Sequence, residues 1–287
     1  MRSEIMSLSR GIDVNSFPYQ LFQKAKQFGT WNPSDIDFSQ DKEDWKRLSP
    51  EQKQSLKLRV SRFIIGEESV TMDILPMIMT VAKKGWLEEE MFLTSFIFEE
   101  AKHVEFFNIF LKEIGEMGDL SFSNEDHKKI WFEMLPSTMN RLLTDPSPQN
   151  IAEAAAMYNL FLEGVQAKTS YYLMYEGVRK MNIMPGLMEG IDKLKTDESR
   201  HISFGIYILQ RLIREEPELY DFVENKLRNE WWPYAEGAWS SNALDDSATD
   251  GFGMKISDIL EYARNEMNVR LSILKKATET ELLNMTK

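Results

Sequence analysis

The sequence predicts an all-α protein built around a four-helix bundle, and three observations support this fold class. Only 14 Gly and 10 Pro punctuate 287 residues, which favours long helices over many short strands. Apolar residues recur at helical spacing, and no stretch shows the alternation typical of a strand. Two Glu-x-x-His pairs, Glu100–His103 and Glu198–His201, lie in long predicted helices, where residues three apart share a face. Such pairs, each preceded by a glutamate on another helix, are typical of a dinuclear metal site inside a four-helix bundle.

The first long helix has a clear start signal. Residues 1–48 look irregular, apart from one short apolar helix. Ser49 can then cap a helix, Pro50 fits its first turn, and Glu51 suits its positive end. Pro76 lies in the last third of this helix, where a kink is expected.

Turn-forming residues separate the remaining helices. Gly85 precedes the second long helix and Gly115 ends it. Pro136 lies within the next, shorter helix, a Pro-rich loop follows at 145–148, and Pro-Gly at 185–186 separates two long helices. In chain order, the expected helices are residues 19–28, 49–84, 87–114, 124–143, 150–181, 187–214, 217–232 and 256–283, the last two flanking a polar loop near 240–253. We expect all of them to form one domain over residues 1–287.

Four glutamates and two histidines form a candidate ligand set. Glu67 precedes Glu100 by 33 residues and Glu163 precedes Glu198 by 35, which places each glutamate opposite a Glu-x-x-His pair at similar depth. Ionised carboxylates on apolar helix faces are costly to bury unless they are paired or metal-bound. The alternative is that these glutamates reach solvent and the histidines pack in the core.

The chemical types of the candidate ligands indicate which metals the site would bind and which reactions it would support. Carboxylate-rich sites with one imidazole per ion suit iron or manganese, whereas zinc prefers thiolates or more nitrogen. Two redox-active ions close together can reduce dioxygen by two electrons. Hydrolysis at a dinuclear site is the alternative chemistry.

Composition excludes several classes of protein. The chain has no cysteine, which rules out disulfides, thiolate metal sites and cysteine nucleophiles. A net charge of −12 argues against general nucleic-acid binding, which needs basic patches. We find no apolar run long enough to span a membrane and no secretory signal at the N-terminus, so a cytoplasmic location is expected.

Several motifs carry a family resemblance that extends over about residues 15–235. The stretch TWNPSDIDFSQD resembles the N-terminal segment of the ribonucleotide reductase small subunit, within the ferritin-like superfamily. The segments GEESVTMDILP, FEEAKHVEFF, MYNLFLEG and DESRHISFGIY resemble more closely the small-subunit-like ligand-binding oxidases. The resemblance therefore implies a ferritin-like bundle with additional flanking helices.

The resemblance also implies a manganese and an iron ion, with di-iron as a possibility, and a role for each ligand. The first metal, manganese, would be held by Glu67, Glu100 and His103, and the second, iron, by Glu163, Glu198 and His201, with Glu100 bridging. Glu67 is chosen over Glu68 because the family's ligand directly follows the glycine. As outer partners, Asp197 would accept a hydrogen bond from His103, and Trp31 would donate to Asp197.

The family's hallmark is an ether bond between a valine β-carbon and a tyrosine oxygen, formed when the reduced metals activate dioxygen. The matching positions are Val70, one turn beyond Glu67, and Tyr158. Tyr158 stands five residues before Glu163, which an ideal α-helix would turn away from the metals. A local π-bulge would restore it. The interpretation without the resemblance is ordinary core packing of both residues.

The resemblance implies a dioxygen-activating oxidase that carries out a two-electron oxidation of a hydrophobic substrate. A long-chain fatty acid would lie in an apolar tunnel with its carboxylate on the metals, an unidentified donor would supply electrons, and the protein would be a homodimer. The alternative is a radical-generating ribonucleotide reductase small subunit. Phe107 stands where the radical tyrosine is expected, and the tail TETELLNMTK has no tyrosine, but some small subunits lack the radical tyrosine and use manganese and iron.

An alternative of another class is an iron-storage protein or a helical protein without catalysis, which would need no Val–Tyr pair. Cage-forming storage proteins are usually much shorter than this chain.

Three further features of the sequence are expected to have structural roles only. His127 is expected on a solvated helix face, Trp231 and Trp232 in the core or at a dimer contact, and the 17 methionines as core filling.

Overall fold

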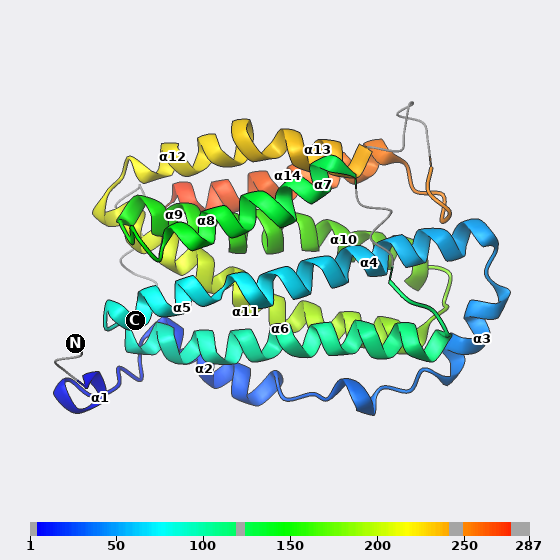
Figure 1. Cartoon of the computed structure of the whole chain (residues 1–287), viewed down its shortest axis with the longest axis horizontal. Helices are drawn as coiled ribbons and strands as arrows, with labels where there is room; N and C mark the ends of the chain where they lie inside the picture. The colour runs from blue at the N-terminus through cyan, green and yellow to red at the C-terminus, as the bar shows by residue number, and fades with distance from the viewer. Residues whose placement is uncertain (1–4, 119–123, 241–248, 277–287) are drawn as a thin grey trace.

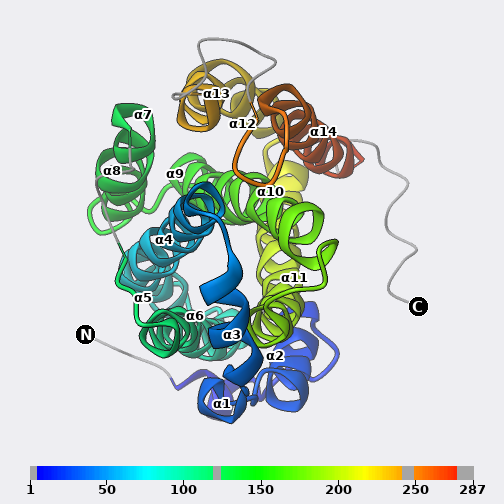
Figure 2. The ribbon, with the colours of Figure 1, turned by 90° about the vertical axis from the view of Figure 1, so that its right-hand side faces the viewer.

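The computed structural model describes residues 5–118, 124–240 and 249–276, and the described chain is helical without a strand. Four long helical segments run along the molecule and surround its centre (Figures 1 and 2). They are α4 (Pro50–Asp73), α6 (Leu87–Ile114), the composite segment α9–η4–α10–η5 (Pro148–Ala155, Ala156–Ala167, Lys168–Leu173 and Met174–Arg179) and α11 (Pro185–Glu215). The predicted all-α four-helix bundle is therefore confirmed.

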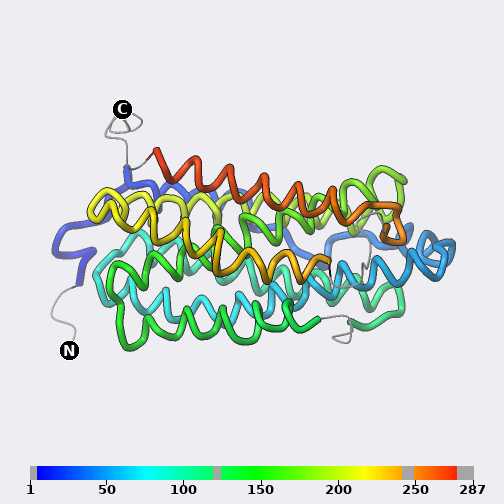
Figure 3. The backbone as a smooth tube through the Cα atoms, turned by 90° about the horizontal axis from the view of Figure 1, so that it is seen from above, coloured from blue at the N-terminus to red at the C-terminus, as the bar shows by residue number. Residues whose placement is uncertain are grey.

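Shorter helices cover the outside of this bundle, and Figure 3 shows the outer helices α12, α13 and α14 extending along its length. The flanking elements are α1 (Met6–Ser9), α2 (Phe17–Phe28), η1 (Pro33–Asp35), α3 (Ser39–Arg47), α5 (Leu75–Lys83), α7 (Glu125–Lys128), η3 (Lys129–Met134), α8 (Leu135–Arg141), α12 (Leu219–Asn225), η6 (Lys226–Trp231), α13 (Trp232–Ser240) and α14 (Ile256–Lys275). Among the described residues, no helix combines the length and the apolar character that crossing a bilayer requires.

Helix boundaries follow the expected signals in the first half of the bundle. Ser49 accepts a hydrogen bond from the Gln52 amide at 3.2 Å, and the Gln52 side chain accepts one from the Ser49 amide at 3.0 Å, which forms a capping box. The helix is interrupted at Ile74, between α4 and α5. Pro76 lies in the first turn of α5, where its missing N–H leaves no hydrogen bond unmade. Gly115 ends α6 with φ of +76°, a conformation that glycine adopts without strain.

Two expectations about helix extent were wrong. Residues 1–48 are not irregular throughout, because α3 forms within the charged stretch SQDKEDWKR. Asp41 on α3 accepts hydrogen bonds from the amides of Gly186 and Leu187 at the start of α11, and Trp45 of α3 packs into an apolar cluster, so both contacts hold α3 in place. The helix expected over 217–232 also continues through α13 to Ser240. Of the last predicted helix and the polar loop, residues 277–283 and 241–248 lie outside the described residues.

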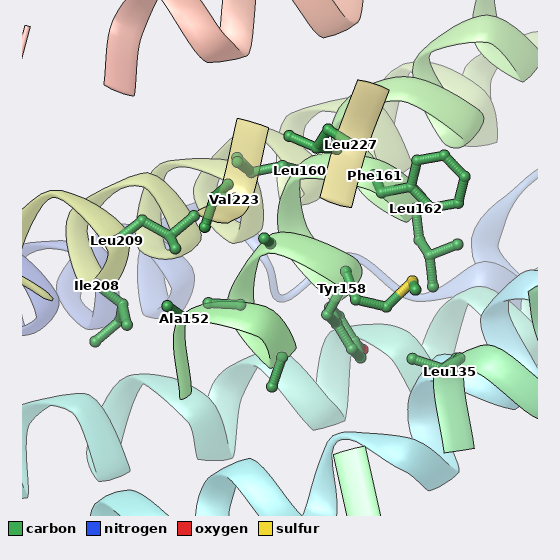
Figure 4. Packing of buried hydrophobic residues seen from close by; sticks show 14 of the residues in the cluster. Leu135, Ala152, Tyr158, Leu160, Phe161, Leu162, Ile208, Leu209, Val223 and Leu227 are labelled. Carbon is green, nitrogen blue, oxygen red and sulfur yellow. The ribbon is translucent and has the colours of Figure 1, made fainter. Parts of the chain in front are cut away.

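Buried apolar residues form two main clusters, one toward each end of the bundle. One contains Val70, Phe96, Tyr158 and Phe204, and the other contains Phe63, Phe106, Phe107, Tyr171 and Leu194. Figure 4 shows Tyr158 in the first cluster together with Leu135 and Leu162. Each of the four bundle helices passes from one cluster to the other, and the acidic candidate residues lie in between. The bundle therefore holds a charged layer between two apolar ones.

His127 corrects a prediction. It lies on α7 with only 6% of its surface exposed, and its ring centroid is 6.1 Å from that of Trp131. Burial and the neighbouring Arg62 charge lower the pKa of His127 to about 3, so the imidazole is neutral at physiological pH. The charged sequence around it, EDHKK, suggested a solvated face, but α13 packs over this short helix. Trp231 and Trp232 are core residues, as expected.

Candidate metal centre

Six side chains from four helical segments converge in the charged layer. Their ligand atoms form two overlapping groups, and the atoms within each group all lie within 4.8 Å of one another. The first group is Glu67, Glu100, His103 and Glu198, and the second is Glu100, Glu163, Glu198 and His201. All six residues are buried, whereas Glu68 is exposed. Glu100 and Glu198 belong to both groups, so either carboxylate can reach both positions.

Both imidazoles direct the same nitrogen toward the carboxylates. His103 Nδ1 lies 3.3 Å from a Glu67 oxygen and 3.6 Å from oxygens of Glu100 and Glu198. His201 Nδ1 lies 2.9 Å from a Glu100 oxygen and 3.6 Å from a Glu163 oxygen. Each group of carboxylates therefore contains one inward-facing Nδ1.

The opposite nitrogens face outer carboxylates. His103 Nε2 lies 3.2 Å from Asp197, which also accepts a hydrogen bond from Trp31 Nε1 at 2.8 Å. His201 Nε2 lies 2.9 Å from Glu99. A carboxylate on the far nitrogen fixes the tautomer and orientation of an imidazole whose near nitrogen binds a metal. The contacts expected for Asp197 and Trp31 are present.

Glu99 is a residue that the sequence reasoning missed, together with the cations that join it to Asp197. Arg200 Nη2 donates to Glu99 at 2.6 Å and to Asp197 at 2.5 Å, and Lys102 Nζ donates to Asp197 at 3.0 Å. A signal was present in the chain. Glu-Glu-Ala-Lys-His at 99–103 and Asp-Glu-Ser-Arg-His at 197–201 repeat an acid, a ligand, a cation and a histidine in the same order.

Burial and mutual repulsion set the protonation of the cluster. Burial raises the pKa of Glu67, Glu163 and Glu198. Burial also acts on Glu100, but the His201 and His103 charges outweigh it and lower the pKa of that carboxyl. The cluster therefore combines groups that hold protons with one that readily ionises, and added cations would displace those protons.

Unpartnered polar atoms test whether the cluster fits metal ions. Thirteen buried side-chain N and O atoms of the described residues have no hydrogen-bond partner, and five of them belong to the candidate ligands: Glu100 Oε1 and Oε2, Glu163 Oε1, Glu198 Oε2 and His201 Nδ1. Buried polar atoms without partners are rare and costly, and these five are concentrated in one small cluster, where His201 Nδ1 and Glu100 Oε1 lie 2.9 Å apart as an ion pair. A donor set of four carboxylates and two imidazoles is the set that suits iron or manganese. The residues present therefore fit a dinuclear site.

Asn159 is a second missed residue, and it supports Glu163. Its Nδ2 donates to Glu163 Oε2 at 2.9 Å and to the His201 carbonyl at 3.2 Å. A β-carbon on Gly205 of α11 would lie 2.1 Å from Asn159, so the glycine makes room for this bridge. A lone asparagine inside an apolar helix carried no sequence signal.

Tyr158 and Val70 lie beside the cluster and next to each other. The segment η4 is a π-helix, and its wider turns stack residues five apart on one side, so Tyr158 and Glu163 share a face. The π-helical conformation expected near Tyr158 is present. The Tyr158 hydroxyl donates to the Val70 carbonyl at 3.1 Å, and both side chains are buried.

A cavity opens from the cluster between the bundle and α7, η3 and α13. Its walls include Glu67, Glu100 and Glu163, with Val70 beside them. Further apolar and aromatic walls come from Phe63, Trp131, Leu162, Ala167, Ala238 and Trp239. The arrangement joins a metal-binding cluster to an apolar pocket.

Comparison with known proteins identifies this combination of fold and site. Residues 18–278 match the family described as the ribonucleotide reductase small chain. A solved R2-like ligand-binding oxidase, a variant with an anaerobically reconstituted Mn/Fe cofactor, is 38% identical, with a TM-score of 0.88 over 95% of this chain and 98% of that chain. The chain belongs to the ribonucleotide reductase small-chain family and, within it, to the R2-like ligand-binding oxidases.

Two further structures of R2-like ligand-binding oxidases show the same similarity. One carries an aerobically reconstituted Mn/Fe cofactor after a long soak, and the other an aerobically reconstituted metal cofactor after photoconversion. Each is 37% identical, with a TM-score of 0.88 over 95% of this chain and 98% of that chain. Both the family and these oxidases are dinuclear metal oxidoreductases, so this R2-like oxidase is an enzyme of that class.

Proposed function

We propose that this R2-like oxidase holds manganese and iron and uses dioxygen to oxidise a hydrophobic substrate. Glu67, Glu100 and His103 would hold manganese, and Glu163, Glu198 and His201 would hold iron, with Glu100 bridging. The observation that carries this proposal is the set of unpartnered, buried ligand atoms at the meeting point of four helices. When bound, the two ions would supply two of the four electrons that reduce dioxygen to water.

The other residues of the site hold and shield this centre. Asp197 and Glu99 orient the two imidazoles, and Asn159 holds one oxygen of Glu163. Phe96 stacks on His201 with ring centroids 3.5 Å apart and keeps water from that side. Burial and the surrounding glutamates raise the pKa of Tyr158, so its hydroxyl keeps a proton at neutral pH.

We further propose an ether bond between Val70 Cβ and the Tyr158 oxygen. Val70 would lose its Cβ hydrogen and Tyr158 its hydroxyl hydrogen, which together release two electrons and two protons. With one electron from each of two metal ions and two protons from solvent, these reduce one dioxygen to two waters. The hydrogen bond between Tyr158 and the Val70 carbonyl supports the proposal because it holds the two residues in contact.

The test is mass spectrometry of digested protein. After anaerobic loading with Mn(II) and Fe(II) and exposure to air, the joined Val70 and Tyr158 peptides are expected to weigh two hydrogens less than their sum. Tyr158→Phe should abolish the joined peptide and leave metal content nearly unchanged. Two peptides that always run separately would overturn the cross-link, and loss of both metals in Tyr158→Phe would contradict the assigned roles.

The apolar cavity supports a long-chain fatty acid as ligand, with its carboxylate toward the metals. An organic extract of the purified protein is expected to contain such an acid. The radical-generating alternative is less well supported, because Phe107 has no hydroxyl to oxidise and stacks on Phe63 with centroids 4.9 Å apart. A homodimer, a single domain and a cytoplasmic location stay predictions; light scattering tests the first.

A further inference from the structure

The cavity has a second polar region at the end away from Val70. Arg62 of α4 and Gln166 of η4 both line it, and Trp239 of α13 connects them. The Arg62 guanidinium lies 4.6 Å over the Trp239 ring, and Trp239 Nε1 donates to Gln166 Oε1 at 2.7 Å. These three side chains form what we call the distal pole.

Arg62 carries a charge that no carboxylate neutralises in the described part of the chain. Its Nη2 donates to the Ala238 carbonyl at 2.8 Å, whereas its Nε is buried without a hydrogen-bond partner. Burial, and then the Arg59 charge, lower the pKa of Arg62 to about 10, so it stays cationic at neutral pH. Removing a guanidinium from water without an anionic partner costs free energy, and a bound ligand anion would lower that cost.

Gln166 adds a second unused donor to the same region. Only 7% of its surface is exposed, its Oε1 is occupied by Trp239, and its Nε2 has no hydrogen-bond partner. The distal pole therefore offers N–H groups from Arg62 and Gln166 to the cavity. Together they match an oxygen acceptor with negative charge.

The spacing between the pole and the cluster is short. Arg62 precedes Glu67 by five residues on α4, which is roughly 7.5 Å along the helix axis. Gln166 follows Glu163 by three residues on η4. A ligand that spans both ends would have about the length of a medium-chain acid, with apolar walls around its middle.

We propose that the cavity of this oxidase binds a medium-chain dicarboxylic acid, one carboxylate facing the metals and the other paired with Arg62 and Gln166. This inference rests on the proposed function, and it offers the dicarboxylic acid as an alternative occupant to the long-chain fatty acid, with one carboxylate toward the metals in both cases. A simple long-chain fatty acid offers nothing to the distal pole. A second carboxylate would satisfy both unused donors.

Titration calorimetry with the metal-loaded full chain tests this proposal, using octanoic acid and octanedioic acid as matched probes. The dioate is expected to bind about 10- to 100-fold more tightly, because a charge-assisted hydrogen bond contributes about that factor. Arg62→Met should remove the preference, Arg62→Lys should keep part of it, and Gln166→Leu should reduce it. Arg264→Met, which removes an exposed guanidinium on α14, is the control and should change neither affinity.

Equal affinity of the wild-type protein for the two acids would overturn the proposal, whatever the folding of the variants. An equal loss of both affinities in Arg62→Met would also overturn it. The proposed function is judged separately, by metal content and by the mass of the Val70 and Tyr158 peptides. A dioate preference without a cross-link would support the distal pole and contradict the cross-link.

Discussion

Glu99 and Asp197 occupy equivalent places beside the two imidazoles. Each precedes a candidate ligand on its own helix and contacts the histidine of the other helix. Arg200 donates a hydrogen bond to both acids and so joins the two outer carboxylates. A substitution of either acid should therefore affect the imidazole that it contacts more than the other imidazole.

Glu99→Gln is expected to weaken one of the two metal-binding steps by about 10- to 100-fold, because a neutral partner orients His201 less firmly. Chelator-competition titration measures the two steps. Glu68→Gln, which changes an exposed carboxyl on α4, is the matched control. Equal weakening of both steps would contradict the pairing of Glu99 with His201 alone.

Asp73 predicts a pH effect on stability that is independent of the metals. It is buried at the end of α4, its Oδ2 has no hydrogen-bond partner, and burial raises its pKa to about 6. Because the folded pKa exceeds the usual value of 3.8, this residue costs stability as the pH rises from about 4 to about 6, and the cost is complete above that.

Asp73→Asn is therefore expected to raise the free energy of unfolding by about 1–2 kcal/mol at pH 8, a value reduced for partial solvation. The gain should be smaller at pH 5. Urea unfolding at the two pH values measures it, with Glu68→Gln again as the control. A gain that is larger at pH 5 would refute the burial explanation.

At the scale of single elements, the π-helical conformation of η4 decides what faces the metals. Tyr158, Asn159 and Glu163 lie on this one segment, and its wide turns bring all three toward α4 and α11. The close approach of α11 depends on Gly205, where any side chain would meet Asn159. Helix packing and ligand support are thus coupled at one contact.

Gly205→Ala is expected to destabilise the protein by about 1–3 kcal/mol through overpacking. It should also weaken metal binding, because Asn159 would leave Glu163. Thermal unfolding and metal titration measure the two effects. Gly118→Ala is the control, since its β-carbon would meet its nearest neighbour at an ordinary 3.7 Å. If Gly205→Ala lowers the stability but leaves the metal affinity unchanged, then the contact with Asn159 serves helix packing alone and does not support Glu163.

Across the whole molecule, a layer of carboxylates lies between two apolar clusters. Those clusters and the flanking helices exclude water from the layer, so its charges repel one another strongly. Protons relieve that repulsion in the metal-free protein, and cations would relieve it better. Metal binding and folding stability are therefore linked.

Chelation of the metals is expected to lower the melting temperature, and anaerobic addition of Mn(II) and Fe(II) to restore it. At a free metal concentration of 100 times Kd, binding at one site raises the free energy of unfolding by about 2.7 kcal/mol. This gain in the free energy of unfolding should shrink as the pH falls, because burial raises the pKa of Glu67, Glu163 and Glu198 and protons then compete with the metals for these carboxylates. A gain that does not depend on pH, or that survives in Glu100→Gln unchanged, would contradict the shared buried site.

Much of this protein follows from the sequence alone. Helical periodicity and local signals at Ser49, Pro76 and Gly115 predict the main helices, because capping and backbone restrictions act between near neighbours. The two Glu-x-x-His pairs predict the bundle and the grouping of six ligands, because helical spacing turns sequence offset into a shared face.

Only the tertiary structure decided the features that depend on contacts between distant segments. His127 is buried although its neighbours in sequence are charged, because α13 covers it. Glu99 pairs with His201 across two helices, and Arg62 meets Gln166 through Trp239. Such contacts join residues roughly 70–180 positions apart, and local propensity carries no information at that range. Periodicity shows which face of a helix is inside, but packing determines which side chains meet there.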